Sequence, residues 1–173
     1  MGDTRTQNAR REPAAAVGSE IRWQWSGFHQ LSVGDLYAVL ALRQRVFIVE
    51  QDCAYQDADG RDAEAWHLLG WGNAKGGAPL LAYARVFPPG VRYAEASIGR
   101  IATAPEVRGR GYGRLLTREA MRRCAELFPG AAIRLGAQRR LEEFYRELGF
   151  VAASEPYLED GIEHVEMVRI ADE

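Results

Sequence analysis

Lysine is almost absent from this chain of 173 residues, because Lys75 is the only one among 22 basic residues. Arginine therefore carries nearly all of the positive charge, and 24 acidic residues bring the formal net charge to -2. A protein that binds nucleic acid through its phosphates shows a basic excess, which this composition lacks. We therefore expect no nucleic-acid partner.

Cysteine, histidine and long apolar runs are also scarce. The two cysteines, Cys53 and Cys124, are too few for a disulfide framework, and neither they nor the three scattered histidines have the spacing of metal ligands. No apolar run approaches the roughly 20 residues of a membrane span. Residues 14–17 are too short to be the core of a signal peptide. We expect a cytoplasmic protein with no metal and no membrane partner.

Length and composition fit one soluble domain, with 47% hydrophobic and 27% charged residues. The chain contains no internal repeat and no interdomain linker. We expect residues 1–19 to form a disordered tail and residues 20–173 a single domain. Apolar strand faces at a sheet edge look the same whether a helix or a second subunit covers them, which leaves room for a homodimer.

Apolar periodicity predicts alternating strands and helices. Ser32, with Asp35 three residues later, predicts a helix N-terminus. The expected elements are a strand at 21–26, a helix from 33 to about 49, a hairpin of 65–71 and 79–87, a strand at 96–104, a helix at 112–128, a strand at 132–137, a helix around 141–148 and a last hairpin of 150–158 and 162–170. This order predicts an α/β fold with a mixed, mostly antiparallel sheet flanked by helices.

An acidic segment follows the first predicted helix, with Arg61 as its only basic residue. Its acidic members are Glu50, Asp52, Asp57, Asp59, Asp62 and Glu64. The segment is either a solvated loop or a surface that attracts a cationic ligand. It does not match a calcium-binding EF-hand, because Arg61 stands where a ligand is needed and Asp62 where glycine belongs.

A glycine-rich turn between a predicted strand and a predicted helix carries the clearest functional signal. It consists of Arg108, Gly109, Arg110, Gly111, Tyr112, Gly113 and Arg114. Glycine allows the backbone to approach a ligand closely, and the N-terminus of the following helix attracts phosphate. The arginines add charge in a form that suits phosphate well. The turn therefore predicts a phosphate-binding site, and the alternative is a plain connection with solvated arginines.

The spacing of the turn separates three phosphate-binding families. A nucleoside-triphosphate P-loop needs Gly-Lys-Ser/Thr, which is absent, and a dinucleotide fold needs G-x-G-x-x-G after an early strand. The sequence Arg108-x-x-Gly111-x-Gly113 instead resembles the Q/R-x-x-G-x-G/A motif of the GNAT superfamily of N-acetyltransferases. That resemblance implies that the turn grips the pyrophosphate of acetyl-CoA.

A second segment resembles another signature of the same superfamily, in which an Asn stands seven residues before the Tyr of F-Y-x-x-x-G-F. Here Gln138 and Tyr145 keep that separation, with Gln in place of Asn. The resemblance implies that Gln138 contacts the cofactor and that Tyr145 protonates the departing thiolate. Phenol and thiol groups have pKa values near 10 and 8.5 in general, which suits this proton transfer. The alternative is that Tyr145 is a core aromatic, because it shares a helical face with Leu141 and Leu148.

Further segments resemble the ElaA-like branch of the superfamily over about residues 21–170. They are Leu42-Arg-Gln-Arg-Val-Phe-Ile-Val-Glu-Gln51, Tyr55-Gln-Asp57, Asp59, His67-Leu-Leu-Gly-Trp71, Ala82-Tyr-Ala-Arg85, Ile98-Gly-Arg100, Leu135-Gly-Ala-Gln138 and Tyr157-Leu-Glu-Asp-Gly161. The resemblance implies one acetyltransferase domain that passes acetyl directly from acetyl-CoA to an amine of a small molecule or a peptide. It does not name the acceptor.

The expected site lies between the strands 98–103 and 132–137. We expect Ile101, Ala102 and Thr103 to contact the cofactor and backbone amides to hold the oxyanion. An amine of the lysine kind is protonated at neutral pH, so it must lose a proton before it attacks. The candidate bases are Glu50, His67 and His164, with a water chain as a further alternative. Glu50 and His67 rank above His164 on sequence grounds.

Two other functions remain open at this stage. Leu42-Arg-x-x-Val-Phe followed by acidic residues is also similar to acyl-homoserine-lactone synthases, which share the fold but use acyl carrier protein. Those enzymes lack the intact glycine turn, so the turn here favours CoA. The second alternative is a non-catalytic CoA-binding module that regulates a partner.

Overall fold

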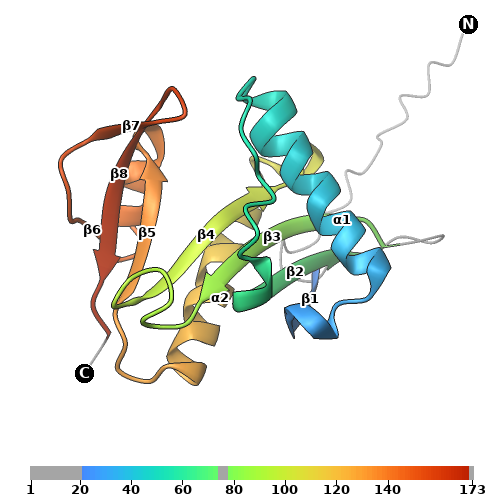
Figure 1. The fold of residues 1–173 in the computed structure, drawn as a ribbon, viewed down its shortest axis with the longest axis horizontal. Coiled ribbons are helices and arrows are strands. Elements are labelled where there is room, and N and C mark those ends of the chain that lie inside the picture. The colour runs from blue at the N-terminus through green and yellow to red at the C-terminus, as the bar shows by residue number, and fades with distance from the viewer. Residues whose placement is uncertain (1–20, 74–77, 172–173) are drawn as a thin grey trace, which may run out of the picture.

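The computed structural model describes residues 21–73 and 78–171, which form one open sheet of eight strands with helices on both faces (Figure 1). The strand order is β1-β2-β3-β4-β5-β8-β6, and β7 also pairs with β8. The predicted mixed, mostly antiparallel α/β fold is confirmed, since β4–β5 is the one parallel pair among the described strands. The predicted tail and residues 74–77 of the first hairpin turn lie outside the described residues.

Most element boundaries agree with the periodicity of the sequence. The strands are β1 (Ile21–Gly27), β2 (Trp66–Gly72), β3 (Leu80–Phe87), β4 (Ala96–Thr103), β5 (Ile133–Gln138), β6 (Val151–Ala152), β7 (Tyr157–Glu159) and β8 (Ile162–Arg169). The α-helices are α1 (Val33–Arg43), α2 (Tyr112–Leu127) and α3 (Glu142–Arg146). None of the helices within 21–73 and 78–171 is long and apolar enough to cross a membrane.

The first helix begins where the sequence predicts. The Ser32 side chain accepts a hydrogen bond from the Asp35 amide at 3.0 Å, and the Asp35 carboxylate accepts one from the Ser32 amide at 3.1 Å. This reciprocal pair satisfies two amides that the first turn leaves open. The helix continues beyond α1 as a π-helical turn, Gln44–Glu50, so the helical run ends close to the predicted position.

The sheet divides between β4 and β5. These parallel strands pair only at Ala96 with Ile133 and Ser97 with Arg134, and beyond that point they diverge (Figure 1). Each half of the sheet stays in register with its own neighbours, because β4 pairs with β3 and β5 pairs with β8. The two halves of the sheet are therefore joined by backbone pairing only at the N-terminal ends of β4 and β5.

The two long helices cover opposite faces of the sheet. Leu116, Ala120 and Cys124 of α2 pack with apolar residues of β2, β3, β4, β5 and β8. Val39 and Leu42 of α1 pack with apolar residues on the other face. Each face therefore has its own core. The core under α2 continues across the line where β4 and β5 separate, whereas the core under α1 includes no residue of β5 or β8.

The predicted strand at 150–158 is wrong as a continuous element. It is broken into β6 and β7, which pair separately with β8. Pro156 cannot donate a backbone hydrogen bond, and the Ser154 hydroxyl accepts from the Glu166 amide at 3.0 Å in place of a backbone carbonyl. The chain thus leaves the sheet between the two short strands, and β7 forms the hairpin with β8 that the sequence predicts.

Candidate active site

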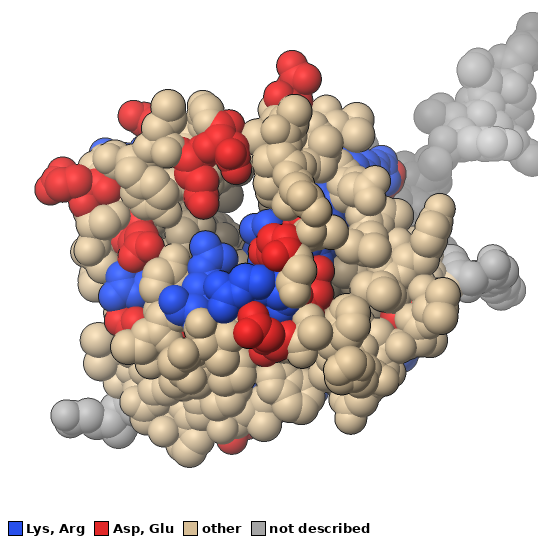
Figure 2. Space-filling model, in the orientation of Figure 1, with Lys and Arg blue, Asp and Glu red and all other residues tan. Residues whose placement is uncertain are grey.

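A cleft of about 610 Å³ opens where β4 and β5 diverge. Its walls come from the π-helical turn, β4, the start of α2, β5, α3 and the turn between β7 and β8. Figure 2 shows one face on which the molecule is hollowed between its two halves, with a band of arginine side chains below the hollow and acidic side chains above it. The cleft combines both signs of charge with an apolar floor.

The glycine turn leads directly into α2 at one wall of the cleft. Gly109 has a φ of 72° and Gly111, the residue that caps α2, has a φ of 81°. Both values lie in the left-handed region, which glycine adopts without steric cost. No side chain caps the first turn of α2. A helix N-terminus without a side-chain cap, at the positive end of the helix dipole, favours the binding of an anion.

The arginines of the turn differ in their partners. Arg108 forms an ion pair with Glu50 at 2.5 Å and donates to the Thr103 carbonyl at 3.2 Å. Arg114 forms an ion pair with Glu147 and lies over the Phe144 ring. Arg110 is exposed and has no carboxylate partner in the described part of the chain. One arginine is thus unpaired, and the other two hold the turn in place.

Tyr145 and Gln138 both line the cleft. Tyr145 is buried and packs edge-on against Phe144 and Phe150, at 5.0 and 5.9 Å between ring centroids. Burial raises the pKa of its hydroxyl, which has no hydrogen-bond partner among the described residues. A core tyrosine normally has a partner for its hydroxyl. An unpartnered hydroxyl on a cavity wall is placed to bond a ligand.

The Gln138 side chain is engaged at both ends. It donates to the Gln51 side chain at 3.0 Å and accepts from Arg140 at 3.0 Å. Because Gln51 follows the π-helical turn and Gln138 ends β5, this bond spans the cleft. A contact between Gln138 and a cofactor stays a prediction.

The strand β4 contains a bulge at the cleft. Tyr83 of β3 faces Ala102 and Arg85 faces Gly99, so two residues of β4, Arg100 and Ile101, stand opposite one residue of β3. Arg100 has a φ of 51°, which is uncommon for a residue other than glycine. A bulge turns backbone groups out of the ladder. The predicted contact residues 101–103 line the cleft immediately beyond it.

The structure separates the three candidate bases. His67 is fully buried away from the cleft lining, its Nε2 lies 3.0 Å from the Asp62 carbonyl, and its Nδ1 lies 2.8 Å from the Tyr83 hydroxyl. Burial lowers the pKa of His67. Glu50 lines the cleft, but its carboxylate is ion-paired with Arg108. The structure therefore does not bring His67 to the site, and it gives Glu50 a competing role.

His164, which ranked last on sequence grounds, has the most suitable geometry. It lines the cleft, and its Nδ1 lies 2.9 Å from the Ile162 carbonyl. A carbonyl only accepts, so Nδ1 carries the proton and Nε2 of the neutral ring carries a lone pair. No hydrogen bond occupies that Nε2 within residues 21–73 and 78–171.

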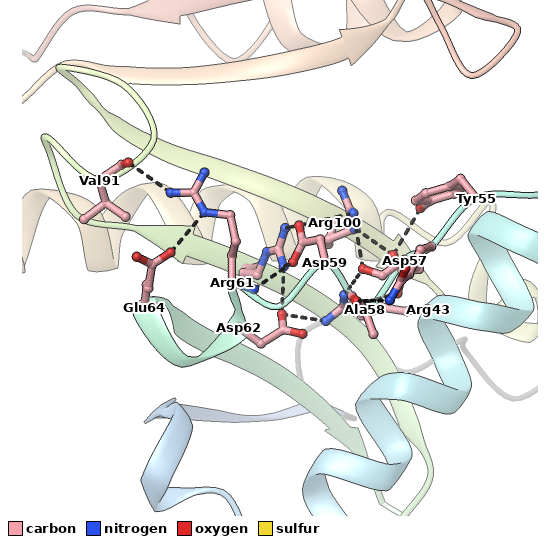
Figure 3. A network of polar contacts seen from close by, with 12 residues as sticks. Arg43, Tyr55, Asp57, Ala58, Asp59, Arg61, Asp62, Glu64, Val91 and Arg100 are labelled. Carbon is pink, nitrogen blue, oxygen red and sulfur yellow. Dashed lines mark hydrogen bonds and ion pairs between the residues drawn. The ribbon is translucent and has the colours of Figure 1, made fainter.

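Neither interpretation of the acidic segment describes Asp57 and Asp62, which are buried among arginines (Figure 3). The arginine–aspartate network consists of Arg43, Arg85, Arg100, Asp57, Asp59 and Asp62. Each arginine bonds an aspartate at 2.7 or 2.8 Å. The charges balance, as a buried ionic cluster requires.

The network holds the bulge of β4 in place through Arg100. Asp57 accepts from Arg43 and from Arg100, each at 2.7 Å, and so ties α1 to β4. Burial works to raise the pKa of Asp62, but the Arg43 charge and hydrogen bonds from Arg85 outweigh it and lower that pKa. Five of the six network residues fall within the segments that resemble ElaA-like proteins, and Asp62 is the exception. That resemblance was the only signal that could have found them.

Comparison with known proteins agrees with this geometry. A family model described as an acetyltransferase (GNAT) domain matches residues 85–171. ElaA of Escherichia coli is 40% identical over 151 residues, which cover 86% of this chain and 96% of that protein. A UPF0039 protein of Synechocystis is 42% identical over 149 residues, with 86% and 95% covered.

Two solved structures are similar over the same range. A Pseudomonas aeruginosa protein described as an acyl-CoA N-acyltransferase has a TM-score of 0.80 at 38% identity, covering 86% of this chain and 99% of that one. The crystal structure of E. coli ElaA has a TM-score of 0.79 at 40% identity, with the same coverage.

Proposed function

Because the chain belongs to the GNAT acetyltransferase family, in its ElaA-like branch, we propose that it transfers acetyl from acetyl-CoA directly to an amine. One observation carries the proposal. The uncapped N-terminus of α2 and the unpartnered hydroxyl of Tyr145 border the same cleft, at the point where the sheet divides. An anion site and a proton donor are the two groups that a CoA thioester reaction needs from the protein.

The residues present fit acetyl-CoA. The N-terminus of α2, which no side chain caps, and the guanidinium of Arg110, which pairs with no described carboxylate, suit a pyrophosphate. The backbone of Ile101, Ala102 and Thr103 lines the cleft beside the bulge, where it can contact the rest of the cofactor. Acetyl-CoA supplies the activated acyl group. Among the described residues, no cluster of histidine, cysteine or carboxylate side chains could hold a metal ion.

The cleft contains candidates for three catalytic roles, which are a base for the amine, a site for the oxyanion and a proton donor for the thiolate. His164 accepts the proton of the acceptor amine at Nε2, because its Nδ1 is bonded to a carbonyl. Backbone amides beside the β4 bulge stabilise negative charge on the acetyl oxygen. Tyr145 donates its proton to the sulfur, which prevents the thiolate from attacking again. Burial raises the pKa of Tyr145, which keeps the hydroxyl protonated and able to donate.

The proposed partner is a small-molecule or peptide amine. The protein has a formal net charge of -2, so we do not expect it to bind a nucleic acid or an anionic membrane surface. A homodimer stays a prediction, and a gel-filtration mass near twice 19.3 kDa would support it.

Substitution of Tyr145 by Phe tests the mechanism. The hydroxyl makes no hydrogen bond with any residue that the structure describes, so the variant should keep its stability and its affinity for acetyl-CoA. We expect kcat to fall about 100-fold, in line with loss of a general acid. Tyr37→Phe is the matched control, because that side chain is 76% exposed on α1. An unchanged kcat in Tyr145→Phe would remove Tyr145 from the mechanism.

Binding and turnover assays separate the two alternatives. An acyl-carrier-dependent synthase predicts no thermal protection by acetyl-CoA, whereas the proposed function predicts a clear rise in Tm. A regulatory module predicts protection without thiol release against any amine of a broad panel. Protection together with thiol release supports acetyl transfer alone.

A further inference from the structure

Ser97 is a polar group without an explanation inside the protein. It lies on β4 at the last paired position before β4 and β5 diverge, and it lines the cleft. Its residue is 3% exposed, and its Oγ has no hydrogen-bond partner within the described residues. A buried hydroxyl without a partner is destabilising, because the group has lost its hydrogen bonds to water and gained none in the protein. Such a group on a cavity wall is positioned to bond something that enters the cavity.

Arg92 is a cation without a counter-charge in the same cleft. It belongs to the loop between β3 and β4, its side chain lines the cleft, and its guanidinium lies 5.4 Å from the centre of the Tyr93 ring. No carboxylate of the described chain lies within ion-pair distance of it. Arg134 nearby differs, since Glu95 and Glu166 both pair with it at 2.7 Å.

Arg100 adds a third donor with a fixed direction. Its Nε donates to Asp57 at 2.7 Å and its Nη2 contacts the same residue and Asp59, whereas Nη1 has no partner among residues 21–73 and 78–171. Figure 3 shows one nitrogen of Arg100 pointing away from the arginine–aspartate network. Arg100 lines the cleft as well, so the network holds this guanidinium with one edge free.

The opposite wall of the cleft has the opposite charge. Glu159, the last residue of β7, and Asp160, in the turn that follows, are exposed and line the cleft, and neither is ion-paired with a described residue. Asp160 and Gly161 take φ values of 49° and 81°, and the Cys53 thiol donates to the Asp160 carbonyl at 3.3 Å, which links this turn to the segment after the π-helical turn. This wall suits an ammonium group.

We propose that the acceptor amine also carries a carboxylate, as an amino acid or a peptide does, and that Arg92, Ser97 and Arg100 bind this carboxylate. Among the described residues, the Ser97 hydroxyl and Nη1 of Arg100 have no acceptor and Arg92 has no carboxylate partner, and all three residues line the cleft together with two carboxylates that form no ion pair. A carboxylate accepts bonds from several donors at once, including the paired N–H groups of a guanidinium. The inference rests on the proposed function, because it names the substrate class of that same site.

Matched acceptors test the inference. Each standard amino acid is compared with the amine that lacks its α-carboxylate, and dipeptides are compared with their C-terminal amides, by thiol release from acetyl-CoA. We expect the carboxylate-bearing member of at least one pair to have a kcat/KM roughly 10-fold or more above that of its partner. Equal or better turnover of the uncharged member in every pair would overturn the inference.

Variants locate the carboxylate. Arg92→Gln should raise KM for the preferred acceptor roughly 10-fold and leave KM for its decarboxylated partner unchanged, and Ser97→Ala should act in the same direction. Arg118→Gln is the matched control, because Arg118 is exposed on α2 and does not line the cleft. A loss in Arg92→Gln that is equal for both members of a pair would contradict the assignment.

Binding of the acetylated products tests the carboxylate subsite independently of acetyl transfer. Calorimetry on the CoA-saturated protein compares N-acetyl amino acids with the corresponding N-acetyl amines. Selective binding of the carboxylates without any turnover would refute acetyl transfer and support the subsite. Turnover of amines with no selectivity in either assay would refute the subsite and support acetyl transfer.

Discussion

His67 and His164 both lie in strands, but their ring nitrogens are in opposite situations. Both nitrogens of His67 are bonded inside the protein, whereas only Nδ1 of His164 has a partner among the described residues, and His164 lines the cleft. Sequence periodicity places each residue in a strand, yet it does not say which strand face borders the cleft. That information depends on the pairing of β8 with β5, which is a long-range property.

Substitution of each histidine should therefore give a different loss. His67→Asn leaves the Tyr83 hydroxyl or the Asp62 carbonyl without its partner, so we expect a loss of about 1–3 kcal/mol in unfolding free energy and less than about a twofold change in kcat. His164→Ala should lower kcat about 100-fold with little change in Tm. Chemical denaturation and steady-state kinetics on both variants measure these effects. The reverse pattern would return His67 to the list of bases.

Glu50 has two possible roles, as the catalytic base and as the ion-pair partner of Arg108, and the two roles predict opposite effects of its substitution. Glu50→Gln removes the carboxylate that pairs with Arg108 and leaves that guanidinium free for a pyrophosphate. We expect acetyl-CoA to bind a few-fold more tightly, with kcat nearly unchanged, because an exposed ion pair is worth about 0.2–1 kcal/mol. Calorimetry and kinetics measure both quantities. A large fall in kcat with unchanged affinity would instead identify Glu50 as the base.

At the scale of elements, the glycine turn and the capped start of α1 are the parts that sequence predicted best. Both depend on residues a few positions apart, such as Ser32 with Asp35, so a local pattern contains the whole signal. The bulge at Arg100 and the break between β6 and β7 were not predicted. They depend on long-range contacts, such as the pairing of β4 with β3 and the ion pair of Arg100 with Asp57, which a local sequence pattern does not contain.

The two inner glycines of the turn should respond differently to alanine. Gly111 has a φ of 81°, so Gly111→Ala should lower the unfolding free energy by about 1–2 kcal/mol and weaken acetyl-CoA binding. Gly113 lies inside α2, and a Cβ there would meet Phe144 at an ordinary 4.0 Å. Gly113→Ala should be neutral or stabilising by up to about 1 kcal/mol. Thermal unfolding with and without acetyl-CoA measures both, and equal losses would contradict this account.

At the scale of the whole molecule, the arginine–aspartate network couples α1, the acidic segment and the neighbouring strands β3 and β4. Composition alone gave no hint of it, because an acidic segment with one arginine looks solvated. The partners Arg43, Arg85 and Arg100 come from three other parts of the chain. Only the ElaA-like resemblance linked these segments before the fold was known.

The network should make the free energy of unfolding decrease at acidic pH. Burial works to raise the pKa of Asp59, and hydrogen bonds from Arg85 outweigh it, so that the pKa of Asp59, like that of Asp62, lies below its ordinary value. Their contribution to stability is therefore present above about pH 4, the unfolded value, and is lost as pH falls through the folded pKa. Urea unfolding at a series of pH values between neutral and about 3 measures this loss.

Asp62→Asn tests the same linkage at neutral pH. The change leaves Arg43 and Arg85 undercompensated in the interior, and breaking a buried pair costs about 3–5 kcal/mol. The variant should also lose less stability on acidification than the parent protein does. Glu163→Gln, an exposed position, is the control. Identical pH profiles for Asp62→Asn and the parent would show that Asp62 does not contribute.

The same network has a consequence for descent. Because the three arginines and three aspartates pair with one another, and Arg43, Asp57, Asp62 and Arg85 are buried, exchange of one buried member leaves a neighbour uncompensated. Over evolutionary time the set should therefore be inherited or lost as a unit. Arg92 and the β7–β8 turn lie outside the set, so they are free to diverge from one lineage to the next. The network beside the cleft should therefore stay constant between relatives, whereas the residues of the cleft wall can change. Such a division allows the enzyme to take new acceptors without a change in its reaction.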